Sequence, residues 1–228
     1  PLLYARFYTA VDAFYPGAGG FALHTVHDPW GNGHNVVVVG GSDDAGIRAA
    51  TAALLTELSK RSAGKELSLP RLMQLQISPA ILKAMPALAR KPDEKAIAQA
   101  VEKARAAFAR GQHTGVTLDL YQAGFNYARS GHDGYAELFK RIARLMIEIY
   151  RSKPATYGGP CGMDADFNSM QLIAAWDLVE ESPVFTEAER LEVTRIIAEY
   201  AIDLGSYGNV RGAARPAIRH NHNTFPCL

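Results

Sequence analysis

The sequence has 228 residues, of which 48% are hydrophobic and 21% are charged, and its formal net charge is +1. This composition is typical of an ordinary globular protein and excludes a disordered or fibrous chain. The near balance of 24 basic and 23 acidic residues argues against a dedicated nucleic-acid binder. No apolar run approaches the ~18 residues that a transmembrane helix requires.

The two ends of the chain suggest that it belongs to a longer protein. It begins at Pro1 without an initiator Met or an apolar leader, and it stops at Leu228 shortly after a dense polar cluster. Because chain termini usually fray, a polar cluster so close to a terminus is unusual for a complete domain. We therefore expect a fragment. Cys161 and Cys227 form no Cys-x-x-Cys zinc motif; free thiols are the favoured interpretation, and a disulfide between them stays open.

Residues 1–68 predict a small α/β domain. Leu2–Val11 and Phe21–Val26 have β character, and Asn35–Val39 is expected to be a strand buried on both faces because it does not alternate. Ser42 is the expected N-cap of the helix that follows. The glycine-rich loop Gly40–Gly46 lacks the spacing of a phosphate-binding loop, so we interpret it as structural.

Residues 69–91 are rich in proline and are expected to be a linker with short helical pieces. From residue 92 to residue 228, apolar residues recur at helical spacing and no strand is convincing. The expected helices lie at Ile97–Phe108, Thr117–Arg129, Tyr135–Ile149, Asp164–Glu181 and Thr186–Leu204, and a sixth begins near Asn221.

These helices alternate in character. Those at 135–149 and 186–204 combine an apolar stripe with a charged back, whereas those at 117–129 and 164–181 are apolar nearly all round. A helix that is apolar on all sides is expected to be buried on all sides. Such alternation is what an inner ring of helices wrapped by an outer ring requires. The predicted fold class is mainly α, an incomplete α/α toroid of antiparallel helix hairpins preceded by the small α/β domain; a flat bundle is the alternative.

Most of the unusual polar residues of the helical part fall in three connections from an expected outer helix to an expected inner one. These connections are Arg110–Gly115, Tyr157–Asp166 and Arg211–Asn223. In a toroid, all connections of this type lie at one end of the barrel, so the three segments should converge on one rim. Glycine-rich loops on a rigid scaffold are where binding and catalytic residues concentrate. The sequence therefore predicts a site at this rim.

The sharpest candidate for that site is the cluster Arg219, His220, Asn221, His222 and Asn223. Such groups can hold a carboxylate, and a histidine can accept or donate a proton near neutral pH. The alternatives are a helix cap with solvated neighbours and a His-x-His metal chelate. No carboxylate is tied to the two histidines by spacing, so we expect neither a metal nor another cofactor.

Asp164 and Asp166 flank the start of the helix expected at 164–181. We interpret them as first-turn acids favoured by the helix dipole; the functional alternative is a general acid or a substrate hydrogen-bond acceptor. Trp176 and Asp177 are interpreted as core packing with one internal hydrogen bond, in preference to a sugar-stacking platform. The same interpretation applies to Tyr121, Asn126 and Tyr127, whereas His24, His27 and Asp28 are interpreted as surface or packing residues.

The order of these parts resembles the heparinase II/III-like and alginate-lyase-like polysaccharide lyases. The resemblance lies in the stretch Val36–Gly46 of a small N-terminal α/β unit and in the pair Asn221-His222 within the helical part that follows. Val36–Gly46 also looks like the non-catalytic N-terminal domain of several secreted glycan-degrading enzymes. The resemblance implies a secreted or periplasmic enzyme whose partner is an acidic polysaccharide or oligosaccharide, with no nucleic-acid or membrane partner.

The resemblance also implies β-elimination at a uronic acid. Asn221, helped by Arg219 or His220, would neutralise the carboxylate, and His222 or a tyrosine would remove the adjacent proton. In this family a tyrosine that protonates the leaving oxygen lies further along the chain than the Asn-His pair, so the fragment alone is expected to be inactive. The remaining substrate-binding candidates are His220, Asn223, Tyr157, Asp164 and Asp166.

Two alternatives to the lyase stay open. One is a glycoside hydrolase on the same toroid, with Asp164 or Asp166 as general acid. The other is a non-catalytic glycan-binding domain. The identity of the uronate polymer and the oligomeric state are not predicted.

Overall fold

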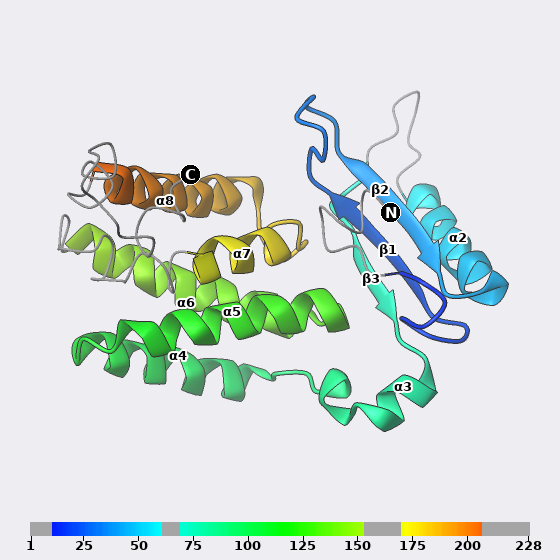
Figure 1. Ribbon diagram of the computed structural model, residues 1–228, viewed down its shortest axis with the longest axis horizontal. Coiled ribbons are helices and arrows are strands. Elements are labelled where there is room, and N and C mark those ends of the chain that lie inside the picture. Colours follow the sequence, from blue (N-terminus) through cyan, green and yellow to red (C-terminus); the bar gives the residue numbers. More distant parts are fainter. Residues whose placement is uncertain (1–10, 61–68, 153–169, 207–228) are drawn as a thin grey trace, which may run out of the picture. The chain divides into compact units, whose positions relative to one another are not determined.

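The computed structural model describes residues 11–60, 69–152 and 170–206 (Figure 1). The described chain is mainly helical, with seven α-helices and one three-stranded antiparallel sheet, so the mainly α fold class is confirmed. It divides into two compact units. Unit 1 contains the described part of Pro1–Arg90 together with Arg129–Gly131 and Glu181–Pro183, and unit 2 contains the rest.

Unit 1 is built on a sheet of β1 (Phe21–Val26), β2 (Val36–Gly41) and β3 (Met73–Gln76) in the order β2-β1-β3. β1 is the central strand and pairs antiparallel with both neighbours. β2 is an edge strand of this sheet and is only half-buried. The expectation that its valines are buried on both faces was therefore wrong, because a run of β-branched residues also suits a strand that packs on one face.

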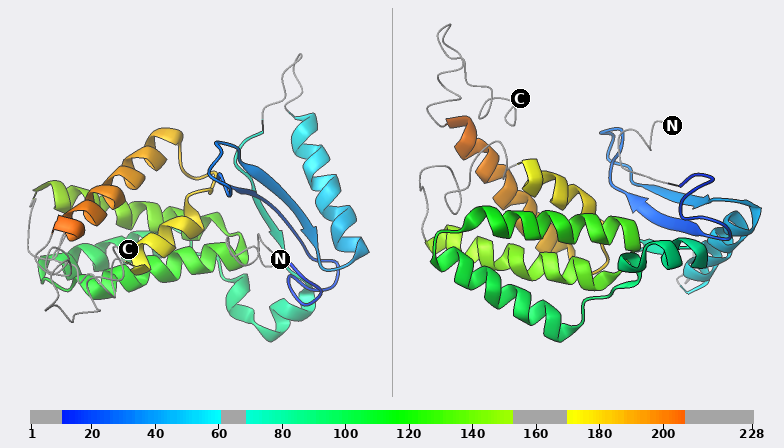
Figure 2. Two further views of the ribbon diagram at one scale, coloured as in Figure 1. Left: turned by 45° about the horizontal axis from the view of Figure 1, so that its top comes forward. Right: turned by 60° about the horizontal axis from the view of Figure 1, so that its bottom comes forward.

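One face of this sheet is covered by α2 (Asp44–Ser59), which lies alongside the strands in both views of Figure 2. The core between sheet and helix is formed by Phe21, Leu23, Ala50 and Leu72, with Val37 and Val39 packed against it. Leu23 and Ala50 are completely buried. α2 thus packs on the sheet through Ala50 with Ala53 and Leu54 beside it, whereas Ile47 and Leu55 are exposed.

The glycine-rich turn between β2 and α2 is structural, as predicted, although its cap differs. The N-cap of α2 is Asp43, whose carboxylate accepts hydrogen bonds from the N–H groups of Gly46 at 2.8 Å and Gly19 at 2.9 Å. Ser42, the expected cap, instead accepts from the Gly17 N–H at 2.8 Å. A Cβ on Gly46 would lie 2.2 Å from the Gly20 carbonyl oxygen, so close backbone approach requires glycine there.

Residues 69–91, the expected linker, contain β3, α3 (Pro79–Ala84) and the 3₁₀ helix η1 (Pro86–Ala89). The short helical pieces agree with the sequence analysis. β3 was not expected, because its four residues Met-Gln-Leu-Gln carry little β signal. The strand forms through pairing with β1, a contact distant in sequence.

Unit 2 consists of α4 (Glu94–Ala109), α5 (His113–Ser130), α6 (Asp133–Ser152), α7 (Met170–Val179) and α8 (Glu187–Ser206). α6 packs against both α4 and α8, so helices two apart along the chain are neighbours (Figures 1 and 2). α5 lies against α7, because a Cβ on Gly124 would be 2.8 Å from the Ala175 carbonyl oxygen. We call α4, α6 and α8 the outer row and α5 with α7 the inner pair.

The three helices of the outer row run in the same direction. In Figure 1 each begins toward the right of unit 2 and ends toward its left side. The chain therefore leaves α4, α6 and α8 at the same end of the unit. Three segments begin there: the turn from α4 to α5, residues 153–169 and residues 207–228.

The core of unit 2 is centred on three aromatic side chains from α6, α7 and the turn before α8. Phe139 is completely buried, and its ring lies 6.0 Å from that of Trp176 and 6.5 Å from that of Phe185. The Trp176 Nε1–H donates to the Thr194 hydroxyl at 3.2 Å. Trp176 is therefore a core residue with an internal hydrogen bond, as predicted.

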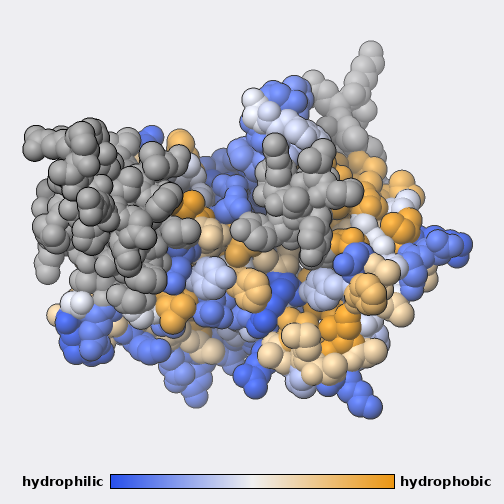
Figure 3. Space-filling model, viewed as in Figure 1, coloured by the Kyte–Doolittle hydropathy of each residue, from blue (hydrophilic) through white to orange (hydrophobic). Residues whose placement is uncertain are grey.

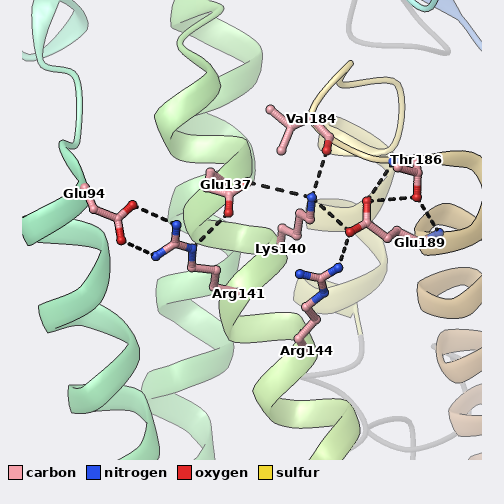
Figure 4. Close-up of polar contacts among 8 residues, drawn as sticks. All are labelled: Glu94, Glu137, Lys140, Arg141, Arg144, Val184, Thr186 and Glu189. Carbon is pink, nitrogen blue, oxygen red and sulfur yellow. Dashed lines mark hydrogen bonds and ion pairs between the residues drawn. The ribbon is translucent and has the colours of Figure 1, made fainter.

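Ion pairs and a helix cap connect the outer row (Figure 4). The predicted capping box of α8 is present: Thr186 N–H donates to Glu189 at 2.8 Å, and Glu189 N–H donates to the Thr186 hydroxyl at 3.2 Å. Glu189 also pairs with Lys140 at 3.0 Å and with Arg144, both on α6. Burial tends to raise the pKa of Glu189, but its hydrogen bonds from Thr186 and Lys140 hold that pKa below the usual value.

The other side of α6 is tied to α4 in the same way. Arg141 makes a two-pronged contact with Glu94, with nitrogen–oxygen distances of 2.6 and 2.8 Å, and a further bond to Glu137 at 2.9 Å. Hydrogen bonds from Arg141 lower the pKa of Glu94. The charged back of α6 that the sequence showed is thus the surface through which α6 contacts both neighbours in its row.

Candidate functional site

All of the site residues predicted from the sequence lie outside the described residues. The segment 153–169 contains Tyr157, Asp164 and Asp166, and the segment 207–228 contains Arg219, His220, Asn221, His222 and Asn223. Cys161 and Cys227 lie outside them as well. The predicted catalytic pair and its substrate-binding neighbours therefore stay predictions.

The described residues do establish where the chain enters these segments. Ser152 ends α6 and Ser206 ends α8, and both helices end on the same side of unit 2 as α4 (Figure 1). In the remaining rim segment, Arg110–Gly115, Arg110 and Gln112 are exposed, and the Arg110 Nε–H donates to the Gln112 side-chain oxygen at 3.1 Å. The helices that lead into the three predicted rim segments thus end on the same side of unit 2.

A second feature of unit 2 is an open face on α5. The sequence predicted that α5 is buried on all sides, and this prediction was wrong. Leu120 and Tyr127 are buried, but Leu118 is 45% exposed and Phe125 is 41% exposed. These two residues are seven apart and lie on the same side of the helix. An apolar composition therefore does not show that a helix is packed on every face.

Two aromatic rings stand on the border of this open face. The Tyr121 ring stacks on the Phe125 ring, with centroids 6.1 Å apart and an angle of 14° between the ring planes. Gln122, on the same side of the helix as Leu118 and Phe125, is exposed. An aromatic pair beside an exposed amide offers both an apolar surface and a hydrogen-bonding group.

α7, the other member of the inner pair, contributes a carboxyl group. Ile173 and Asp177, one turn apart, are both exposed. Nevertheless, partial burial of the Asp177 carboxyl raises its pKa, so this acid holds its proton to a higher pH than an ordinary aspartate. The interpretation of Asp177 as core packing was therefore wrong. Nothing in the sequence distinguishes it from other helix aspartates, because its environment is set by packing.

The inner pair thus presents aromatic rings on α5 and a readily protonated acid on α7. Rings of this kind can stack on the apolar face of a sugar, and such an acid can donate a hydrogen bond or a proton. The described residues contain no group of three or more His, Cys, Asp or Glu side chains placed to bind a metal ion. Within residues 11–60, 69–152 and 170–206, no helix is long and apolar enough to cross a membrane.

Comparison of the chain with protein-family models, with curated proteins and with solved structures gave no match. The family resemblance proposed from Val36–Gly46 and Asn221-His222 therefore rests on those residues and on the order of the parts.

Proposed function

We propose that this protein is a polysaccharide lyase that cleaves a uronic-acid-containing glycan by β-elimination, and that unit 2 is part of an α/α toroid. The observation that carries the proposal is the common end of the outer row. The segments with the predicted catalytic and substrate-binding residues begin where α6 and α8 end, on one side of unit 2.

The packing of unit 2 supports the toroid. α6 packs on α4 and α8, whereas α5 lies against α7, so alternate helices belong to different rows. Helix hairpins wound into inner and outer rings produce this arrangement. The open face of α5 and the exposed side of α7 are then surfaces that an inner ring turns toward its lumen.

The chemistry assigned to the segment after α8 follows from its side chains. The Asn221 amide, helped by the Arg219 guanidinium or by His220, neutralises the uronate carboxylate and so makes the proton on the adjacent carbon more acidic. His222 accepts that proton. The electron pair left on carbon forms the new C=C bond as the glycosidic C–O bond breaks, and a tyrosine protonates the departing oxygen.

The other predicted residues have binding roles in this proposal. Tyr157 and Asn223 offer hydrogen-bond donors to sugar hydroxyls, and Asp164 and Asp166 offer acceptors. The substrate is an acidic polysaccharide or oligosaccharide, and the protein acts in the periplasm or outside the cell. No cofactor takes part in the proposed steps.

The proposal is tested by binding and turnover measured together on the full chain. Isothermal titration calorimetry compares a uronate oligosaccharide with the same oligosaccharide after its carboxyl groups are reduced to alcohols. We expect the uronate to bind at least about tenfold more tightly, which corresponds to about 1.4 kcal/mol, and N221A to abolish that preference. Absorbance of the unsaturated product reports elimination, which H222A should reduce wherever it is detected.

Equal affinity for the two oligosaccharides would contradict the proposal. Turnover that yields only saturated products and disappears in D164N or D166N would instead identify a glycoside hydrolase. Uronate binding that depends on Asn221, together with turnover that H222A leaves unchanged, would indicate that this segment is a non-catalytic glycan-binding site. Q99A serves as the matched control, because Gln99 is an exposed amide on α4 that lies outside the three predicted rim segments.

A further inference from the structure

The hairpin loop between β1 and β2 exposes a tryptophan. Trp30 lies in the loop His27–Asn35 and is 56% exposed. Residues 31–35, which follow it, are exposed as well. A large aromatic side chain held in solvent contributes little to folding, because little of its apolar surface is removed from water. The exposure of Trp30 therefore calls for a different explanation from that of the buried aromatic residues of unit 2.

The backbone of this loop is held by its own side chains. The Asp28 carboxylate accepts hydrogen bonds from the N–H groups of Asn32 at 2.7 Å and Gly33 at 2.9 Å. Asn35 in turn accepts from the Asp28 N–H at 3.2 Å. Asp28 itself has φ +29°, a left-handed conformation that is uncommon outside glycine. Trp30 thus stands on a closed turn, and a turn ordered in advance reduces the entropy lost when a ligand binds.

Besides the Asp28 carboxylate, which accepts the backbone hydrogen bonds of the loop, the side chains near Trp30 include those of Asn32 and His34. Asn32 uses its side-chain oxygen to accept from the His34 N–H at 3.1 Å, which leaves its NH₂ group to donate. The Nδ1 of His34 lies 3.0 Å from the Asn32 carbonyl oxygen and must therefore donate to it. In the neutral ring, Nε2 is then an acceptor that faces solvent. The loop contains neither Lys nor Arg.

This set of groups fits a sugar better than a membrane. A pyranose ring presents an apolar face of C–H groups that stacks on an indole, and its hydroxyls need nearby donors and acceptors. A peripheral membrane site instead combines several apolar side chains with basic residues. In Figure 3 the loop projects at the top of the view and is coloured mainly blue to pale on the side shown.

We propose that Trp30, Asn32 and His34 form a polysaccharide-contact site on unit 1, in which the indole stacks on one sugar ring and the two polar side chains bind its hydroxyls. The choice of a polysaccharide rests on the proposed function of the chain. The site shares no residue with the set assigned to catalysis, and its role is to hold polymeric substrate.

The test is affinity electrophoresis of the full chain through gels that contain alginate or neutral hydroxyethylcellulose. We expect W30A to weaken retardation by at least about tenfold in Kd, and W30F to retain part of it. F14A is the matched control, because Phe14 is 85% exposed on another turn of unit 1 that is closed by an aspartate, Asp12. F14A should migrate like the wild type.

Three results would overturn the inference. The first is that W30A is retarded as strongly as the wild type, or that neither gel retards the wild type at all. The second is an equal loss in F14A, which would indicate a general effect of exposed aromatic residues. The third is Trp30-dependent sedimentation with vesicles of phosphatidylcholine and phosphatidylglycerol without Trp30-dependent retardation by either polymer, which would identify a membrane site.

The outcome is separable from that of the proposed function. If W30A loses polymer binding but uronates bind no better than their reduced forms, the hairpin site stands and the lyase proposal fails. If uronate selectivity depends on Asn221 but W30A is retarded like the wild type, the lyase proposal stands and the hairpin site fails.

Discussion

The helices of the outer row and those of the inner pair in unit 2 make different kinds of side-chain contact. In the outer row, Glu189 caps its own helix and pairs with two cations of α6, and Arg141 joins α6 to α4. On the inner pair, Leu118 and Phe125 of α5 remain open to solvent. The described part of the outer row is thus joined by ion pairs, although it also exposes apolar surface, since Leu191 of α8 is 59% exposed.

The two groups of helices thus differ in how they are joined, by ion pairs in the outer row and by close backbone approach between α5 and α7. Exposed aromatic residues beside polar side chains are typical of surfaces that bind something. The comparison leads to four predictions, each of which pairs a residue with a matched control. Unfolding in urea, followed by the helical circular dichroism signal, measures the free energy of unfolding in each case.

The largest change in the free energy of unfolding is expected at Phe139, and Phe125 of the same unit is its control. Phe139 is completely buried among Trp176 and Phe185, so Phe139→Ala should lower the free energy of unfolding by about 3–5 kcal/mol through lost burial and a cavity. Phe125→Ala, on the open face of α5, should cost less than about 1 kcal/mol. Equal losses would mean that the face of α5 is packed, and the comparison between the two rows would fail.

The elements of the fold that depend on local sequence could be predicted. The bounds of β1 match the expected strand, and the capping box of Thr186 and Glu189 is present, because both depend on residues close together in the chain. The expected helices from residue 92 onward also correspond to α4 through α8 within a few residues, except that the described part of the fourth begins at Met170. Local spacing was sufficient for these elements.

The partial exposure of α5 could not be predicted, because the composition of a helix does not show which of its faces pack against other elements. The sequence shows that Leu118 and Phe125 are apolar but not that both side chains are partly exposed. β3 was missed because it forms by pairing with β1, which is distant in sequence. Ser42 was preferred over Asp43 as the N-cap of α2 because both residue types are good N-caps, and only the backbone conformation shows which of the two takes that position. The predicted site residues, Asn221 and His222 among them, lie outside the described part of the chain.

The second prediction concerns the contact within the inner pair. A Cβ on Gly124 would lie 2.8 Å from the Ala175 carbonyl oxygen and 3.1 Å from its Cα, so Gly124→Ala must push the two helices apart and should cost about 1–3 kcal/mol. Gly115, on the same helix, has open space around it. Gly115→Ala should therefore stabilise α5 by about 0.5–1 kcal/mol. A stabilising Gly124→Ala would show that α5 and α7 do not pack closely.

The third prediction addresses the ion pairs of the outer row. Glu189→Ala removes the capping box of α8 and leaves Lys140, which is largely buried, without this carboxylate. We expect a loss of about 1–2 kcal/mol, from the cap and the desolvated cation together. Glu102→Ala is the control, because the pair of Glu102 with Arg105 is exposed at 3.6 Å and should contribute less than about 0.5 kcal/mol. Similar losses in the two variants would argue against a role for burial in this network.

The smallest effect, and the most direct probe of the inner pair, is the pH dependence conferred by Asp177. Because partial burial raises its pKa above the usual 3.8, the folded protein holds this proton more tightly than the unfolded chain does. The contribution of Asp177 to stability is therefore fully present below about pH 4 and is lost as pH rises through the raised pKa. Asp177→Asn should unfold like the wild type in acid and become more stable than it by up to about 0.5 kcal/mol near pH 7.

Glu102→Gln, which removes an exposed carboxylate of α4, is the control for that curve. A wild-type curve that Asp177→Asn does not alter would mean that the carboxyl is fully hydrated. The expected divergence at higher pH would instead show that partial burial of the carboxyl on α7 raises its pKa in the folded protein. Asp177 would then differ from Glu189 of the outer row, whose hydrogen bonds from Thr186 and Lys140 lower its pKa.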